Sequence, residues 1–262
     1  MKTESGAREV ADSLRKECSN PDVAIVIPAL NEENTIYSVV QGFREAAAAC
    51  GMCAQVIVID DHSIDGTAEM AELAGAAVIE PASSAGLASA FRAGLSEVNR
   101  LGIPLIVHAD ADGQYAPEDL AALLRAKASG ADLVVGNRLT SRPKGMTRER
   151  YWGNVLLSRL ISLIAGVSIP DSQSGYRIFD LRLAGEVVIA GDFTYTQEQL
   201  VKAARSGYSI AFVPVTFRPR EHGTSRLVKS TFSYIARLIP VLFSLLAGRR
   251  RRRSSRRSGV HC

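Results

Sequence analysis

The stretch VAIVIPALNEE at residues 23–33 decides the fold. Its first half is a run of apolar, mostly β-branched side chains, and its second half turns abruptly polar. A short run that is apolar throughout, without alternation of polar and apolar residues, is typical of a strand covered on both faces. We therefore expect residues 23–27 to form a buried strand that ends in a polar loop.

The same pattern recurs along the chain. Further apolar runs lie at residues 56–59, 77–79, 105–107 and 133–135. Helix-like stretches separate them, at residues 33–49, 67–73, 85–100 and 117–128. Buried strands that alternate with amphipathic helices predict an α/β fold, with a mostly parallel central sheet flanked by helices.

Polar residues follow three of these runs. Glu32 comes after the first run, Asp60 and Asp61 end the second, and Asp110 and Asp112 follow the fourth. In parallel sheets, ligands bind beyond the carboxyl ends of the strands. The sequence therefore predicts an acidic ligand-binding edge.

Asp110 and Asp112 are two residues apart and are followed by Gly113 and Gln114. Acidic residues after strands often cap helices instead, as Asp61 could do. Two carboxylates at this spacing can turn toward one hard cation, which also relieves the repulsion between them. The motif therefore favours a divalent metal site over a helix cap.

The second half of the chain contains basic and turn-rich segments. Residues 140–150 predict a basic surface loop, residues 171–177 a polar turn, and residues 218–226 a second basic loop. Residues 151–165 and 196–206 have helical patterns. Residues 210–217 predict a strand, and Pro214 within it indicates the edge of a sheet.

The positive charge is concentrated at the C-terminus. The formal charge is +4, yet seven arginines lie in residues 249–262, and without them 24 basic residues face 27 acidic ones, a balance of −3. A basic tail on an acidic body argues against nucleic-acid binding by the chain as a whole.

Residues 230–248 are amphipathic, and their apolar stretch at 234–248 is shorter than the roughly 20 residues that a membrane-spanning helix needs. Together with the arginine-rich tail, they predict a helix on an anionic membrane surface. The alternative is a core-packing helix with a solubilising tail. Residues 1–21 form a polar extension without the apolar run of a signal peptide. We therefore expect a cytoplasmic protein, peripherally associated with the cytoplasmic membrane face.

Six sequence blocks, in order, resemble family 2 glycosyltransferases of the GT-A fold, and within them the dolichol-phosphate mannose synthase group. The blocks are VAIVIPALNEENTI at residues 23–36, VIVIDDHSIDGT at 56–67, HADADGQY at 108–115, VVGNRL at 134–139, DSQSGYRIFD at 171–180 and VPVTFRPREHGTSRL at 213–227. The resemblance implies a glycosyltransferase domain over residues 22–229. It also implies metal-dependent, inverting transfer of a hexose from GDP-mannose, UDP-glucose or UDP-N-acetylglucosamine to a polyprenyl or dolichyl phosphate.

The resemblance also implies roles for residues in these blocks. Mg²⁺ or Mn²⁺ would be held by Asp110, Asp112 and Gln114, and Asp112 and Arg220 would be catalytic. The acceptor phosphate would be bound by Arg138, Arg150 and Asn154, although the group commonly has Ser at the last position. The donor would be bound by Pro28, Leu30, Glu32, Val58, Asp60, Ala109, Asp110, Ala111, Arg220 and Arg226. At the last of these positions the mannose synthases typically have Lys.

The acceptor determines whether a general base is needed. A phosphate monoester is already ionised at pH 7, so it needs only a cationic site that orients it. A hydroxyl acceptor must lose its proton to a base, for which Asp171, Glu198 and His222 are candidates. Two alternatives to a polyprenyl-phosphate sugar synthase remain. One is an enzyme that transfers the hexose to a soluble sugar or metabolite hydroxyl, and the other is a non-catalytic nucleotide-binding membrane scaffold.

Overall fold

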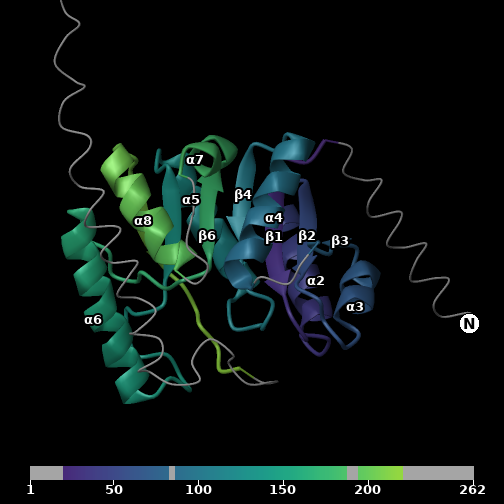
Figure 1. Cartoon of the computed structure of the whole chain (residues 1–262), viewed down its shortest axis with the longest axis horizontal. Helices are drawn as coiled ribbons and strands as arrows, with labels where there is room; N and C mark the ends of the chain where they lie inside the picture. The colour runs from purple at the N-terminus through teal and green to yellow at the C-terminus, as the bar shows by residue number, and fades with distance from the viewer. Residues whose placement is uncertain (1–19, 83–85, 188–193, 221–262) are drawn as a thin grey trace, which may run out of the picture. The chain divides into compact units, whose positions relative to one another are not determined.

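The computed structural model describes residues 20–82, 86–187 and 194–220. A seven-stranded sheet runs through them in the order β3-β2-β1-β4-β6-β5-β7 (Figure 1). The strands are β1 Val23–Ala29, β2 Ala54–Asp60, β3 Ala77–Ile79, β4 Leu105–His108, β5 Leu133–Asn137, β6 Arg177–Asp180 and β7 Ile210–Pro214. The helices are α2 Ile36–Ala49, α3 Thr67–Leu73, α4 Leu87–Leu101, the 3₁₀ turn η1 Pro117–Asp119, α5 Leu120–Ala128, α6 Arg148–Ala165, α7 Leu181–Glu186 and α8 Tyr195–Ser206.

Strand β1 shows why the apolar run decides the fold. All seven of its residues are buried, and it pairs in parallel with both β2 and β4. Val23, Ile25 and Ile27 belong to a core shared with α2, α3 and α5. Alternate residues face the other layer, where a Cβ added at Gly94 of α4 would lie 2.4 Å from Val26. The absence of a side chain at position 94 lets α4 approach the sheet closely.

The predicted mostly parallel α/β architecture is confirmed. The five predicted strands are present, each within two residues of its expected limits, and β7 lies at the sheet edge, as Pro214 indicated. β7 ends at Pro214, and beyond it Phe217 forms an isolated bridge to Tyr115.

Strand β6 was not predicted from the sequence, and it is antiparallel to both β4 and β5. Its four residues follow a polar turn and begin with Arg177, whose charge hides the strand pattern. The Arg177 side chain is fully buried and donates hydrogen bonds to the carbonyls of Ser174 and Thr196 and to the Gln199 amide oxygen, at 2.8–2.9 Å.

The reversed direction of β6 brings one more loop to the functional edge. His108 at the end of β4 and Val135 near the end of β5 both pair with Arg177, the first residue of β6. The loop before β6, residues 171–176, therefore lies at the same edge as the loops that follow β1, β2, β4 and β5.

None of the described helices is long and apolar enough to cross a membrane. The predicted membrane helix at residues 230–248, the arginine tail at 249–262 and nearly all of the N-terminal extension lie outside the described residues. The proposed division into these segments stays a prediction.

Candidate active site

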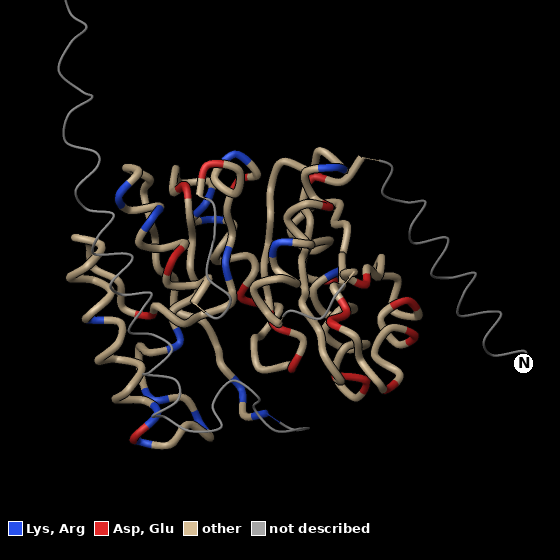
Figure 2. Tube along the Cα trace, in the orientation of Figure 1, with Lys and Arg blue, Asp and Glu red and all other residues tan. Residues whose placement is uncertain are grey.

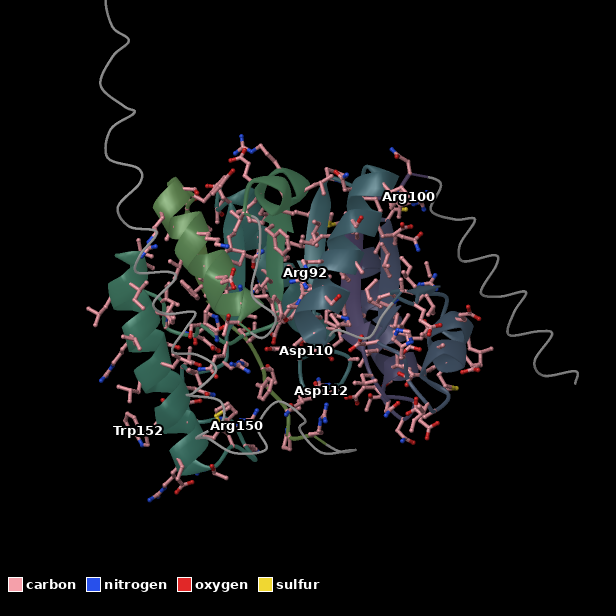
Figure 3. All side chains as sticks on the ribbon, viewed as in Figure 1. Arg92, Arg100, Asp110, Asp112, Arg150 and Trp152 are labelled. Carbon is pink, nitrogen blue, oxygen red and sulfur yellow. The ribbon has the colours of Figure 1, made fainter. Side chains whose placement is uncertain are left out.

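Asp110 and Asp112 lie on the loop that follows β4, and Figure 3 shows both at the lower edge of the sheet. Two hydrogen bonds shape this loop. The Thr35 hydroxyl donates to the Ala111 carbonyl at 2.8 Å, and the Gln114 backbone N–H donates to the Asp112 carboxylate at 3.1 Å. The loop after β1 therefore supports the loop that carries the two carboxylates.

The Asp110 carboxylate lies near Arg138, Arg177 and Arg220 but forms no ion pair with any of them. No described residue donates a hydrogen bond to it. Burial and then the nearby charge of Asp112 raise its pKa above the usual value, although the charges of the three arginines oppose this shift. It also packs directly on Gly175, where an added Cβ would lie 2.6 Å from Oδ1. A carboxylate in these surroundings would be stabilised as an anion by a bound cation.

Arg220 joins the two acidic loops. One of its guanidinium nitrogens donates to Glu32 at 2.7 Å and to Asp112 at 3.1 Å, and all three side chains are partly buried. Burial raises the pKa of Glu32, although the charge of Arg220 opposes that shift. Residues 188 positions apart in the chain thus share one cluster of charge.

The loop after β2 has a fixed shape beside this cluster. Asp60 accepts hydrogen bonds from the backbone N–H and the hydroxyl of Ser63, and the Asn31 N–H donates to the same hydroxyl at 2.8 Å. Asn31 and His62 have left-handed backbone angles, with φ of 54° and 62°. Among the predicted donor-binding residues, Asp60 is the buried last residue of β2 and contacts the loop that follows, whereas Val58 and Pro28 are buried inside their strands.

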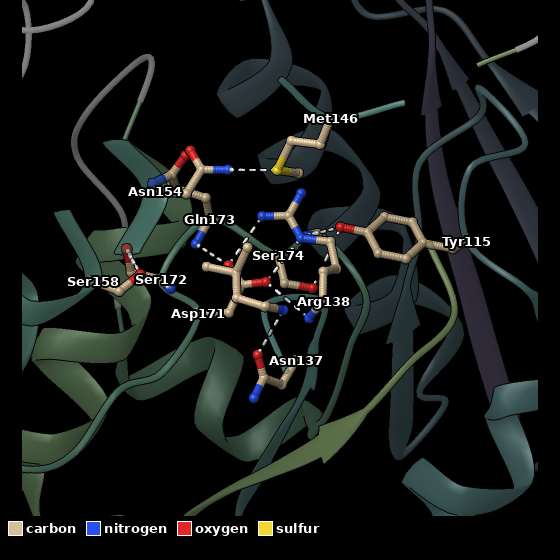
Figure 4. Close-up of polar contacts among 12 residues, drawn as sticks. Tyr115, Asn137, Arg138, Met146, Asn154, Ser158, Asp171, Ser172, Gln173 and Ser174 are labelled. Atoms are coloured by element: carbon tan, nitrogen blue, oxygen red, sulfur yellow. Dashed lines mark hydrogen bonds and ion pairs between the residues drawn. The ribbon is translucent and has the colours of Figure 1, made fainter. Parts of the chain in front are cut away.

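Arg138 at the end of β5 forms a buried two-pronged ion pair with Asp171 (Figure 4). Its Nε and Nη2 donate to the two carboxylate oxygens at 2.8 and 3.0 Å, and its backbone N–H adds a third bond at 3.1 Å. The guanidinium also lies over the Phe217 ring, 5.0 Å from its centroid. Burial alone would raise the pKa of Asp171, but Arg138 outweighs this effect and lowers it.

Helix α6 carries the other two predicted acceptor residues. Partial burial and repulsion from Arg138 and Arg220 lower the pKa of Arg150, whereas the charge of Asp112 raises it. These residues are thus close enough to influence one another. No described carboxylate contacts the Arg150 guanidinium. Asn154 is buried, and its amide nitrogen lies 3.9 Å from the Met146 sulfur.

Three residues that the sequence analysis did not single out hold the loop at 171–176. The Tyr115 hydroxyl accepts a hydrogen bond from the Gly175 N–H at 2.8 Å, and the His108 Nδ1–H donates to the Gly175 carbonyl at 2.7 Å. Burial lowers the pKa of His108 to about 4, so its ring is neutral at pH 7. Ser158 of α6 accepts from the Ser172 N–H at 2.9 Å. Their roles depend on contacts between distant segments, which a single sequence does not display.

The two carboxylates fit a metal ion whose remaining ligands come from the enzyme's substrate. Among the described residues, no three His, Cys, Asp or Glu side chains are grouped to hold an ion. Mg²⁺ sites commonly use only one or two carboxylates, together with substrate phosphates. The predicted third ligand, Gln114, is nearby, and its amide nitrogen donates to the Arg218 carbonyl at 2.9 Å.

The other predicted residues divide into two groups. Arg226 and His222 lie outside the described residues. Glu198, a candidate base for a hydroxyl acceptor, is buried and lies 2.9 Å from Lys202 on the next turn of α8. Leu30, Ala109 and Ala111 lie on the loops of the same edge.

Comparisons with known proteins identify the family of this chain. The family model for Glycosyl transferase family 2 matches residues 24–188. The polyprenol monophosphomannose synthase of Mycolicibacterium smegmatis is 32% identical over 219 residues, which cover 78% of this chain and 80% of that protein. The dolichyl-phosphate hexose transferase of Haloferax volcanii is 32% identical over 199 residues, which cover 76% of this chain and 84% of that protein.

A solved structure shares the fold. The glucosyl-3-phosphoglycerate synthase of Mycobacterium tuberculosis, determined with Mn²⁺, uridine diphosphate and glucosyl-3-phosphoglycerate, superposes with a TM-score of 0.67 at 21% identity. The match covers 90% of this chain and 84% of that one. With its GT-A fold and these sequence relatives, the chain belongs to glycosyltransferase family 2, and within it the chain is similar to the polyprenyl-phosphate sugar synthases.

Proposed function

We propose that this glycosyltransferase moves one hexose from a nucleotide sugar to a polyprenyl phosphate, in a metal-dependent reaction that inverts the anomeric carbon. The observation that carries the proposal is the buried pair of Arg138 and Asp171 beside Arg150. Arg150 supplies positive charge to the acceptor side of the site, and the ion pair with Arg138 removes Asp171 as a base.

The donor side is acidic and suited to a diphosphate only when cations are present. Asp110 and Asp112 would hold Mg²⁺ or Mn²⁺, which supplies Lewis-acid stabilisation of the leaving diphosphate when bound. Arg220, held by Glu32 and Asp112, would place a second positive charge against the same phosphates. Both contributions would strengthen as negative charge develops on the leaving group, which is the condition for lowering the barrier.

The acceptor side favours a phosphate over a hydroxyl. Asp171 is bound to Arg138 and has a lowered pKa, so it is a weak proton acceptor. Glu198 is paired with Lys202. A polyprenyl phosphate needs neither residue, since its oxygen is already ionised. Arg150 and Arg138 would hold that phosphate for in-line attack on the anomeric carbon, and one such displacement inverts the configuration.

The relatives support the same acceptor class. Two proteins that are 32% identical to this chain are named for polyprenol and dolichyl phosphate, with a mannose and a hexose as the sugar. GDP-mannose, UDP-glucose and UDP-N-acetylglucosamine all remain candidate donors. Because the acceptor is a lipid, we place the enzyme at the cytoplasmic face of the membrane, bound peripherally.

Extraction into organic solvent tests this function. Purified enzyme would be incubated with radiolabelled nucleotide sugars, Mg²⁺ or Mn²⁺ and polyprenyl phosphate. We expect one donor to give a labelled lipid that partitions into the organic phase. Label found only in water-soluble acceptors would contradict the proposal.

Asp112→Asn provides the control for the metal site, because it keeps the size of the side chain and removes its charge. We expect it to abolish transfer and metal-dependent donor binding. The matched control is Asp132→Asn. Asp132 accepts hydrogen bonds from Ser209 and lies away from the functional edge of the sheet, so this variant should leave transfer and donor binding unchanged. If the Asp112 variant binds donor and metal normally, the metal assignment is wrong.

A further inference from the structure

Helix α6 has an apolar stripe that faces away from the protein. Trp152, Leu156, Leu160 and Leu163 recur at intervals of four, four and three residues, and all four are exposed, by 61, 70, 39 and 74%. Residues at these intervals lie on one side of a helix. Val167, just past the end of the helix, continues this stripe and is 43% exposed.

The opposite side of α6 packs on the protein. Leu157, Ile161 and Ile164 are buried. Figure 3 shows Trp152 pointing outward while Arg150, two residues earlier, points toward the site. The helix is therefore apolar on two sides, of which the protein covers one. A surface helix that is built only to be soluble would carry polar side chains on the other side.

Basic side chains surround the stripe. Apart from Arg150, four exposed basic residues and one acidic residue, Glu149, lie in the loop before α6 and on the helix itself; the basic ones are Arg142, Lys144, Arg148 and Arg159. Figure 2 shows most of these charges gathered at one end of the helix. An apolar face with a basic rim and an exposed tryptophan is the pattern of a helix that lies in a membrane interface.

We infer that the apolar stripe of α6, residues 152, 156, 160, 163 and 167, docks on the surface of an anionic phospholipid bilayer. This inference rests on the proposed function and extends it. Arg150 lies on the same helix, so docking would bring the acceptor site to the depth at which a polyprenyl phosphate presents its headgroup.

Charge favours the bilayer over two other occupants. A second copy of the chain would bring a second set of four basic residues against the first. The chain's own apolar segment at residues 234–248 is followed at once by five consecutive arginines, so covering the stripe with it would place like charges together. An anionic lipid surface is attracted to both sets.

Trp152 is the single tryptophan of the chain, so its fluorescence reports on the stripe without any substitution. The full-length protein would be titrated with vesicles of phosphatidylglycerol and phosphatidylcholine. We expect the emission to shift to shorter wavelength and to be quenched by lipids with brominated acyl chains. Vesicles of phosphatidylcholine alone, or high salt, should weaken the binding at least tenfold.

Two outcomes would overturn the inference. Emission that is already blue-shifted and protected from acrylamide without lipid, and that vesicles leave unchanged, would mean that the stripe is covered by protein. If this protection depends on protein concentration, a second copy of the chain covers the stripe. If it does not, the chain's own segment covers it. Vesicle binding without any change in Trp152 emission would place the membrane contact elsewhere.

Glutamine substitutions test the apolar contribution without changing charge. Leu156→Gln with Leu163→Gln should lower vesicle binding at least fivefold, whereas Leu101→Gln, at an exposed leucine on α4, should not. The double variant should keep its transfer to a short-chain, water-soluble isoprenyl phosphate. If wild type makes no glycolipid from any polyprenyl phosphate and Trp152 still enters the bilayer, the proposed function fails and the docking surface stands.

Discussion

Two aspartates of the site have opposite electrostatic surroundings. Asp171 receives two bonds from the Arg138 side chain, which lower its pKa, whereas Asp110 receives none from the described residues and has a raised pKa. An ion pair already stabilises the first carboxylate as an anion. The second forms no ion pair with a described residue, and this difference is the basis for proposing a structural role for Asp171 and metal binding for Asp110.

Gly175→Ala tests the placement of Asp110 without removing its carboxylate. The new Cβ would lie 2.6 Å from Oδ1, so the side chain of Asp110 must move. Since a displacement of about 1 Å can cost 10²-fold in rate, we expect transfer to fall at least tenfold and the metal concentration for half-maximal activity to rise. Gly153→Ala, where an added Cβ meets nothing within 4 Å, is the matched control. Equal activity of the two variants would contradict this geometry.

Arg150→Gln tests the acceptor side. The change removes a guanidinium that no described carboxylate neutralises, so the acceptor phosphate would lose a charged partner. We expect the KM for polyprenyl phosphate to rise at least tenfold while donor binding stays unchanged. Arg159→Gln removes the same charge from an exposed position on the same helix and should change the KM for a soluble acceptor less than twofold. A larger effect on donor binding than on acceptor KM would reassign Arg150.

At the scale of elements, the reversed strand β6 determines the architecture of the site. It delivers residues 171–176 to the edge formed by the parallel strands, where the carboxylate of Asp171 meets the end of β5. Tyr115 and His108 then fix the backbone of Gly175 from the loop after β4 and from β4 itself. One antiparallel strand thus couples the loop that carries Asp110 and Asp112, Arg138 at the end of β5, and helix α6.

Asp171→Asn should destabilise this coupling strongly. Breaking a buried ion pair by removing one partner costs about 3–5 kcal/mol, because the other charge stays buried without compensation. Asp180→Asn breaks a pair with Lys127 in which the aspartate is 43% exposed, so we expect a loss of about 1 kcal/mol or less. Chemical denaturation of both variants checks the difference. Similar losses would mean that Arg138 finds another partner or water.

The sequence predicted the parallel framework but not how its loops meet. Five apolar runs are local patterns, and each became a strand of nearly the expected length. Strand β6 escaped prediction because Arg177 opens it, and the burial of that arginine depends partly on two oxygens of the distant helix α8, from Thr196 and Gln199. The D-x-D pair could be predicted from its spacing together with its position after a buried strand. The contact of Arg220 with Glu32 and Asp112 joins segments that lie far apart in the chain, so no local pattern contains it.

At the scale of the whole molecule, the charges divide by task. In the proposed function, the carboxylates and Arg220 lie on the donor side and Arg138 and Arg150 on the acceptor side, while four basic residues surround the outward stripe of α6. The net charge of +4 alone does not show how these charges are distributed. If the proposed function is right, this arrangement would place the nucleotide and the lipid substrate side by side along one sheet edge.

Donor binding should stabilise the whole protein only with metal present. A ligand at 100 times its Kd adds about 2.7 kcal/mol to the free energy of unfolding, which is roughly 5–10 °C in Tm for a domain of this size. We expect one nucleotide sugar to give this shift with Mn²⁺, and the shift to disappear with chelator or in Asp112→Asn. A full shift without metal would contradict a metal-dependent donor site.

The central claim is that the acceptor is a phosphate and needs no general base. It is tested most directly by comparing transfer to a polyprenyl phosphate with transfer to the polyprenol of the same chain length, under identical conditions. The arrangement of Arg138, Arg150 and Asp171 predicts a glycolipid from the phosphate and a rate at least a hundredfold lower with the alcohol. Equal or faster transfer to the alcohol would contradict it.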